Sequence, residues 1–219
     1  RQDLVNPERR SQRVLLALQQ ALGMKTLPKH IECFDNSNTQ GEDPVAAMVC
    51  FMDGKPAKSE YRHFNIKTVV GADDFASMEE VVYRRYRRLL DEDKPLPDLV
   101  VIDGGKGQLH AAYRAVEALG VQDRIMLVGI AKRLEDIYKV GDDLPIYIDK
   151  KSEAQKLLQE VRDQVHHFGI SHHRKKRSKT SIASALDGAP GIGKTLSQKL
   201  LKHFKTVIHI KEASVEELA

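Results

Sequence analysis

Two aspartates stand where strand-like segments of the chain end, and their position suggests metal chemistry. Asp35 follows the segment His30–Phe34, and Asp103 follows the apolar run Leu99–Ile102. If these segments are neighbouring strands, their backbones lie roughly 4.8 Å apart and both carboxylates share one edge of the sheet. Two carboxylates that close favour a bound divalent cation, and oxygen ligands suit Mg²⁺ or Mn²⁺. The alternative is that each aspartate only caps a turn.

A third ligand is expected from a helix that follows the sheet. The segment Arg162–Phe168 contains three side chains of metal-binding type, Asp163, His166 and His167. Helical geometry places His166 and His167 on opposite flanks of the apolar stripe, so only one of them can face a given site. Periodicity does not choose between them, and an inert, solvated histidine is the alternative for either.

The first half of the chain predicts an antiparallel meander. A helix within the first 28 residues ends at Gly23. Three extended segments follow in quick succession, and a turn signal at Asp53–Pro56 separates the second from the third. These segments are 30–35, 45–51 and 61–66. A helix from about Ser77 comes next, with four arginines outside its apolar face: Arg84, Arg85, Arg87 and Arg88.

The second half of the chain changes to parallel pairing. Short apolar runs over 99–102 and 125–130 are typical of strands buried on both faces, and the helix between them completes a βαβ unit. A hairpin is expected between 137–140 and 146–148, and a helix begins at Ser152. Since the first and fourth strands of this order can lie side by side, we expect an α/β fold, a mixed sheet with flanking helices.

The pattern Gly188–Thr195 matches GxxxxGK[ST], the phosphate-binding loop of nucleotide hydrolases. That loop must follow a buried strand, whereas residues 181–187 have helical spacing, so we expect no bound nucleotide. A small all-α helix-hairpin-helix module fits better, in which Gly191, Gly193 and Lys194 hold a DNA phosphate. Its second helix should turn its apolar side chains inward: Leu196, Leu200, Leu201 and Phe204. A hairpin used only for packing is the alternative.

The charge of the chain is unevenly distributed. The 219 residues are 41% hydrophobic and 30% charged, as in globular proteins, and the net charge is only +4. Residues 166–179 nevertheless contain nine Lys, Arg or His and no acid. Such clustering favours a polyanionic partner. Arg84, Arg85 and Arg174 are candidate phosphate contacts, and simple surface charge is the alternative for each. A solvated linker is the alternative for the basic run.

Other features bound the class of protein. No uncharged stretch is long enough for a transmembrane helix, and the start of the chain lacks a secretory signal, so we expect a cytoplasmic protein with no membrane partner. Cys33 and Cys50 lie in apolar runs without CxxC spacing. This predicts buried free thiols rather than a disulfide or a zinc site.

Six short motifs cover most of the chain in a fixed order. They are Phe34–Gly41, Tyr61–Phe64, Asp74–Val81, Arg84–Tyr86, Ile102–Leu109 and Arg162–Phe168. Together they resemble the C-terminal half of the UvrC family, the excinuclease subunit of bacterial nucleotide excision repair. The resemblance implies an RNase H-like endonuclease domain whose metal site uses Asp35, Asp103 and His166.

The resemblance also implies a function and partners. This half of the family's protein hydrolyses a phosphodiester bond 5′ of a DNA lesion, in a complex of DNA with UvrB that UvrA has prepared. A catalytically silent, structure-selective DNA-binding scaffold is the alternative. Both predict DNA binding that weakens as salt rises, but only the nuclease predicts nicking that requires Mg²⁺ or Mn²⁺ and stops with EDTA.

The chain departs from the family pattern in two motifs. Asn36 and Asn38 stand where the family usually has Ile and His, and Gln164 and His167 stand where it usually has Glu and Arg. The contacts that those family side chains make are therefore not implied for this chain, whereas Asp35 and the other two ligand positions are retained.

Four segments are expected along the chain. They are an N-terminal helix and connector over 1–28, an RNase H-like endonuclease domain over 29–170, a basic linker over 171–180 and a helix-hairpin-helix module over 181–219 with a truncated second hairpin. Since no start methionine is present, we expect a piece of a longer protein, without the family's N-terminal nuclease domain and UvrB-docking region.

Overall fold

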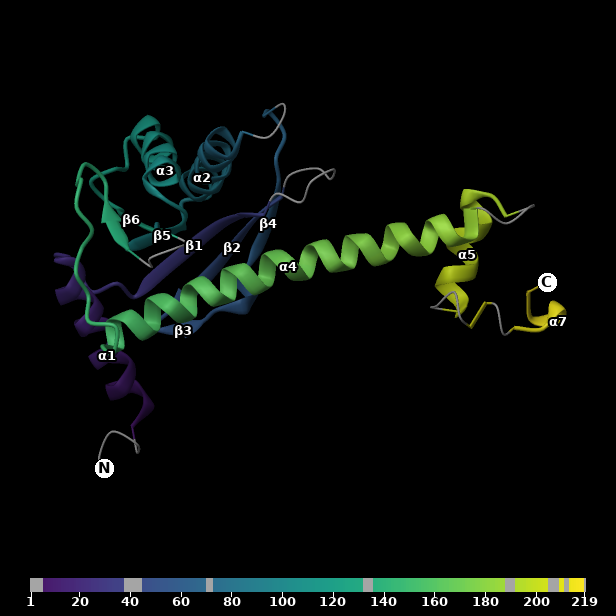
Figure 1. Ribbon diagram of the computed structural model, residues 1–219, viewed down its shortest axis with the longest axis horizontal. Coiled ribbons are helices and arrows are strands. Elements are labelled where there is room, and N and C mark those ends of the chain that lie inside the picture. The colour runs from purple at the N-terminus through teal and green to yellow at the C-terminus, as the bar shows by residue number, and fades with distance from the viewer. Residues whose placement is uncertain are drawn as a thin grey trace. The chain divides into compact units, whose positions relative to one another are not determined.

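A mixed β-sheet between two layers of helices forms the first part of the chain (Figure 1). The computed structural model describes residues 6–37, 45–69, 73–131, 136–187, 192–204, 209–210 and 213–218. Contacts divide the chain into two units, Arg1–Ile170 and Ser171–Ala219. The sheet and its helices confirm the predicted α/β class.

The sheet has seven strands in the order β3-β2-β1-β5-β6-β7, with β4 also paired to β2. Their bounds are β1 His30–Ser37, β2 Val45–Met52, β3 Lys55–Pro56, β4 Arg62–Asn65, β5 Leu99–Asp103, β6 Met126–Ile130 and β7 Ile137–Lys139. β1 pairs antiparallel with β2 and parallel with β5. β5 pairs parallel with β6, and β7 is antiparallel to β6. The first and fourth predicted strands are therefore neighbours, as expected.

Two of the predicted hairpins are only partly formed. The turn after β2 places Asp53 and Gly54 at φ 51° and 76°, as a tight hairpin requires. It leads only into the two-residue strand β3, and the 3-10 helix η2 (Lys58–Glu60) follows before β4 pairs with the other half of β2. The hairpin expected over 137–148 is reduced to β7 and a single bridge between Ile137 and Ile146.

The helices begin and end at residues with the expected chemistry. They are α1 Pro7–Leu22, α2 Asp74–Asp91, α3 Lys106–Ala118, α4 Glu153–Asp187, α5 Lys194–Phe204 and α7 Val215–Leu218. Gly23 closes α1 at φ 63°, as predicted. The side chain of Asp73 accepts hydrogen bonds from two backbone N–H groups of α2, which therefore starts three residues before the predicted Ser77.

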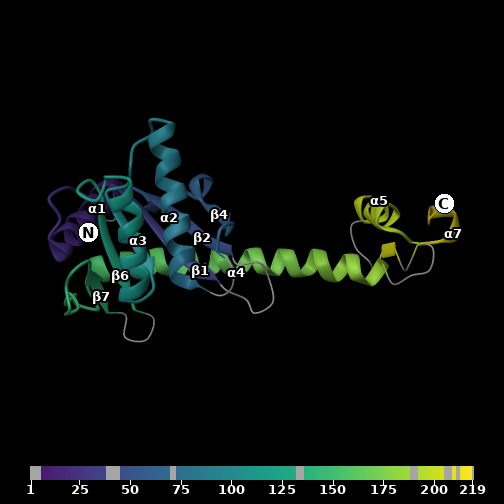
Figure 2. The same cartoon turned by 90° about the horizontal axis from the view of Figure 1, so that it is seen from above.

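Alternate residues of each strand face opposite helix layers. In β1 and β5, Cys33 and Val101 pack with α1 and α4, whereas Phe34 and Ile102 pack with α2 and α3. Both views show α2 and α3 together on one face of the sheet (Figures 1 and 2). The buried leucines of α1 belong to the same core as the sheet: Leu15, Leu18 and Leu22. The helix expected as a separate segment over 1–28 is thus part of the first unit.

The second unit is all α in its described part. The backbone over 171–180, expected as a linker, is helical and belongs to α4. Around α5, Leu200 and Ile210 are buried and Phe204 packs against them. Leu196 is 42% exposed, contrary to its predicted inward position, and Ser197 is buried instead. Ser214 and Glu217 exchange backbone and side-chain hydrogen bonds at the start of α7.

A buried ion pair connects β1 to α2. Glu32 is fully buried, and the Nη2 of Arg85 donates to its Oε1 at 2.7 Å. Tyr86 donates from its hydroxyl to the other carboxylate oxygen at 2.9 Å, and the Nε2 of His30 lies 3.2 Å from Oε1. Arg85, expected outside the apolar face and as a phosphate contact, is only 8% exposed and is held by Glu32. This burial argues against a DNA contact for Arg85.

Replacing Glu32 tests this pair. Burial works against ionisation of Glu32, but hydrogen bonds from His30 and Arg85 and the charge of Arg85 outweigh it and lower the pKa below the ordinary 4.5. The ion pair therefore stabilises the fold fully at pH values above the ordinary pKa of a glutamate. This stabilisation is lost as the pH falls through the lowered pKa of Glu32. We expect Glu32→Gln to reduce the free energy of unfolding by about 3–5 kcal/mol near neutral pH, and by less in acid.

Urea unfolding near neutral pH and in acid measures how much stability the variant loses under each condition. Glu79→Gln is the matched control, because Glu79 forms an exposed ion pair with Arg114 and its loss should change stability little. Equal losses for the two variants would contradict a structural role for the buried pair.

Candidate metal centre

Three side chains meet where β1 and β5 end. The ligand atoms of Asp35, Asp103 and His166 all lie within 4.8 Å of one another. The two aspartates are 3% and 4% exposed, whereas the side chain of His166 is 59% exposed. The cluster therefore has a buried carboxylate floor and one side open to solvent.

The strand register explains why the two carboxylates meet. Cys33 lies beside Val101 and Phe34 beside Ile102, so continuing the parallel register by one residue places Asp35 beside Asp103. Both aspartates share the face of Cys33 and Val101, because side chains alternate along a strand. That face packs against α4, the helix that carries His166.

The structure selects one of the three candidate side chains on α4. The Nδ1 of His166 lies 3.5 Å from Oδ2 of Asp35. Asp163 is exposed and accepts a hydrogen bond from Gln159 at 2.8 Å. The Nδ1 of His167 lies 2.8 Å from the backbone oxygen of Asp163 in its own helix. Of these three side chains, His166 is therefore the one that reaches the carboxylates.

An aromatic cluster fixes this turn of α4 against the edge of the sheet. The ring of His63 stacks on Phe168 with centroids 3.8 Å apart, and its Nε2 lies 3.0 Å from the Phe168 backbone oxygen. Tyr61 packs edge-on against Phe168 at 5.2 Å and donates from its hydroxyl to Gln164 at 3.3 Å. His166 lies between Gln164 and Phe168 in the chain, so both contacts hold its turn of helix in place.

Arg162 is a residue of the site to which the sequence pattern gave no role. Its Nε donates to Oδ1 of Asp103 at 3.2 Å, and its side chain is only 17% exposed. The spacing from Arg162 to His166 is four residues, which places both on one face of α4. This spacing is the feature of the sequence that could have indicated that Arg162 faces the same site as His166.

Cys33 lies beneath the carboxylates and takes no part in the cluster. Burial, and then the charges of Asp103 and Asp35, raise the pKa of its thiol well above the ordinary 9.0. Cys33 therefore stays a neutral, apolar packing group. Both cysteines are buried and free, as predicted.

A family model for the UvrC RNAse H endonuclease domain matches residues 19–170. The chain belongs to the UvrC family. It is 52% identical to the UvrABC system protein C of Flavobacterium johnsoniae, over 99% of this chain and 36% of that protein. The corresponding proteins of Christiangramia forsetii and Porphyromonas gingivalis W83 are 54% and 51% identical, over 99% and 100% of this chain. The chain spans just over a third of the length of these relatives.

The crystal structure of human ENDOV is a more distant likeness of this UvrC domain. Its TM-score is 0.34 with 18% identity, and the match covers 58% of each chain. None of the described helices combines the length and apolar character needed to cross a membrane.

The remaining predicted DNA contacts of the UvrC chain have varied surroundings. Arg84 donates to the backbone oxygen of Asn65 at 2.7 Å and to Glu80 at 2.9 Å, and its side chain is one-third exposed. Gly193 precedes α5, and its backbone oxygen accepts from Ser197. The remaining three lie outside the described part: Gly191 entirely, and Arg174 and Lys194 in their side chains. The residues that directly precede Gly188 belong to the helix α4, and not to the buried strand that a nucleotide-binding loop must follow.

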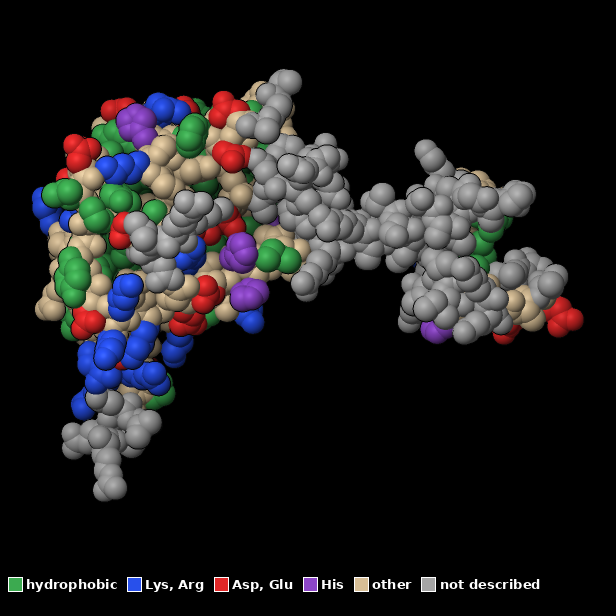
Figure 3. Space-filling model, in the orientation of Figure 1, with side chains coloured by type: hydrophobic (Ala, Val, Ile, Leu, Met, Phe, Trp, Pro, Cys, Tyr) green, Lys and Arg blue, Asp and Glu red, His purple; other side chains and the backbone are tan. Residues whose placement is uncertain are grey.

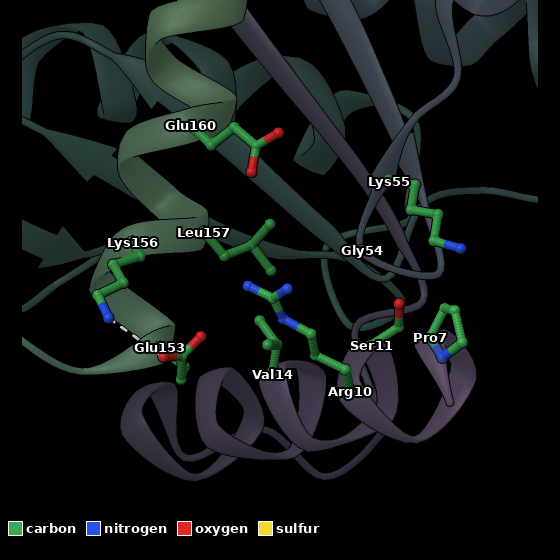
Figure 4. Close-up of a pocket in the computed structure, with 10 residues that line it drawn as sticks. All are labelled: Pro7, Arg10, Ser11, Val14, Gly54, Lys55, Glu153, Lys156, Leu157 and Glu160. Atoms are coloured by element: carbon green, nitrogen blue, oxygen red, sulfur yellow. Dashed lines mark hydrogen bonds and ion pairs between the residues drawn. The ribbon is translucent and has the colours of Figure 1, made fainter. Parts of the chain in front are cut away.

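A separate cavity lies between α1, the β2–β3 turn and α4 (Figure 4). Its volume is about 380 Å³, and Arg10 points into it toward Leu157. Nearby, Lys156 pairs with Glu153 at 3.2 Å. Lys and Arg side chains also gather over α1 on the face drawn in Figure 3. No member of the carboxylate and histidine cluster lines this cavity, so it is distinct from the candidate metal centre.

Shortening Phe168 tests how the histidine turn is held. We expect Phe168→Ala to reduce the free energy of unfolding by about 1–3 kcal/mol, less than for a fully buried ring, because it removes contacts with His63 and Tyr61. Urea unfolding measures the loss. Tyr147→Ala is the control, since that ring is 91% exposed and should contribute little. Indistinguishable stabilities would show that the aromatic cluster does not hold α4 on the sheet.

Proposed function

We propose that this domain is a divalent-metal-dependent endonuclease that hydrolyses a DNA phosphodiester bond at Asp35, Asp103 and His166. The observation that supports this most is that these side chains, from three separate elements, bring their ligand atoms within 4.8 Å of one another. The chain's membership of the UvrC RNAse H endonuclease family agrees with it.

The donor set suits Mg²⁺ or Mn²⁺. Asp35 and Asp103 offer carboxylate oxygens, and neighbouring buried carboxylates repel each other unless positive charge lies between them. His166 adds an imidazole nitrogen, which Mn²⁺ tolerates. A cation held there would supply charge neutralisation at the phosphate and would lower the pKa of a bound water. The residues present therefore fit the metal that this chemistry requires.

His166 is placed to handle a proton. Its Nδ1 faces Asp35 at 3.5 Å, so the carboxylate orients the imidazole ring. The exposed remainder of the ring is accessible to substrate. His166 can thus complete the ligand set or accept the proton of the attacking water, and a neutral imidazole serves either role near neutral pH.

In this proposal the basic residues of 171–180 and the rest of the second unit bind DNA. Backbone phosphates bind Lys and Arg without reading sequence, and we assign such contacts to Arg174, Gly191, Gly193 and Lys194. Arg84 remains a further candidate because its side chain is partly exposed. By the relationship to UvrABC system protein C, we propose an incision 5′ of a lesion, on DNA bound by UvrB after preparation by UvrA.

Replacing either aspartate should abolish cleavage. We expect Asp35→Asn and Asp103→Asn to leave DNA binding intact and to eliminate nicking of a bubble duplex in Mg²⁺ or Mn²⁺, because each removes a charged metal ligand. Nicking with and without UvrB, and with EDTA, measures the effect. Cleavage at the wild-type rate by either variant would refute the ligand assignment. DNA binding by the wild type without nicking at any metal concentration would favour the silent scaffold.

A pair of adjacent histidines provides a matched comparison. His166→Ala should reduce nicking by a factor on the order of 10²–10⁴, the usual range for loss of a positioned acid or base. His167→Ala should retain activity, because His167 bonds only within its own helix in the contacts described. The opposite ranking of the two variants would move the catalytic role to His167.

A further inference from the structure

We propose that Arg162 is the built-in counter-ion of the carboxylate pair: its guanidinium balances Asp103 in the metal-free protein and competes with a divalent cation for that carboxylate. The competition rests on the proposed function, whereas the counter-ion role does not. Arg162 is therefore a positioning residue that acts through Asp103.

The surroundings of Asp103 create the need for a counter-ion. Asp103 and Asp35 are almost fully buried, and their carboxylates lie within 4.8 Å of each other. Like charges that close, removed from water, destabilise the fold strongly unless they are compensated. Cys33, directly below, is neutral, and the imidazole of His166 carries charge only when protonated. Arg162 brings a permanent positive charge to the pair.

The geometry of the Arg162 contact differs from that of the structural pair on the other face of the sheet. Arg85 holds Glu32 through two nitrogens, at 2.7 and 3.4 Å, and Tyr86 adds a third bond to the same carboxylate. Arg162 holds Asp103 through Nε at 3.2 Å, and its side chain is about twice as exposed as that of Arg85. The Arg162–Asp103 contact is thus longer than the shorter Arg85–Glu32 contact and closer to solvent, which suits a group that yields its carboxylate to a metal ion.

Arg162 must also weaken metal binding. A divalent cation held by Asp103 would be close to the positive charge of Arg162, which contacts the same carboxylate, and like charges that close repel appreciably in a partly buried site. Because Arg162 and His166 are on one face of α4, the same helix would supply a ligand for the cation, His166, and the group that competes with the cation for Asp103, Arg162. The negative phosphate of a bound substrate would offset this repulsion.

A double-mutant cycle in EDTA tests the counter-ion role without metal. We expect Arg162→Met to lower the thermal unfolding midpoint by several degrees, and by much less when Asp103→Asn is also present. Arg114→Met, which breaks an exposed pair with Glu79, is the control with the same loss of charge. Additive effects of the two substitutions would overturn the proposal. If Arg162→Met alone does not fold, folding of the double variant supports it, and failure of both variants counts against it.

A Mn²⁺ titration followed by calorimetry tests the competition. Arg162→Met should bind Mn²⁺ on the order of tenfold more tightly than the wild type, and Arg162→Lys, which keeps the charge, should bind like the wild type. Equal or weaker binding by folded Arg162→Met would overturn the competition. If the wild type itself binds no Mn²⁺ or Mg²⁺, the proposed function fails, and the cycle in EDTA still decides the counter-ion role.

Discussion

Two negative charges placed side by side in a nearly water-free position are the constraint on which this domain depends. Parallel pairing of β1 with β5 brings Asp35 and Asp103 together at the ends of buried strands, where neither carboxylate is well solvated. The helix α4 places a cationic side chain and an imidazole, both on one of its faces, next to these carboxylates. The aromatic contacts of Phe168 then serve to keep that face of α4 on the carboxylates.

The two buried arginine–carboxylate pairs differ in role: Glu32–Arg85 stabilises the fold, and Asp103–Arg162 lies at the candidate metal centre. On the face of α2 and α3, Glu32 is surrounded by Arg85, Tyr86 and His30, so its charge is fully engaged within the fold. On the face of α4, Asp103 is bonded by Arg162 beside a side chain that is open to solvent. A buried carboxylate is thus surrounded by protein partners on one side of the sheet and lies beside a solvent-exposed histidine on the other.

Local sequence patterns were sufficient for the central strands of the sheet and for two members of the site, but not for the two hairpins that are only partly formed. Apolar runs that stop at Asp35 and Asp103 predict strand ends, and the order of strands and helices along the chain predicts that these two strands lie side by side. The position of Arg85 outside the apolar face was predicted wrongly, because its partner Glu32 lies 53 residues away and helical phase does not reveal a buried ion pair. Arg162 was missed for the same reason, since Asp103 is 59 residues distant. His166 was chosen only through the family resemblance, because periodicity left His167 equally placed.

The alternation of side chains along β1 and β5 has a consequence for how such a chain can change in evolution. Inserting or deleting one residue inside either strand would turn every later side chain to the opposite face. An insertion, for example, would put Phe34 or Ile102 in the place of an aspartate beside α4. Length changes should therefore accumulate in the connections between strands, while the residue count from the start of each strand to its aspartate stays constant across relatives.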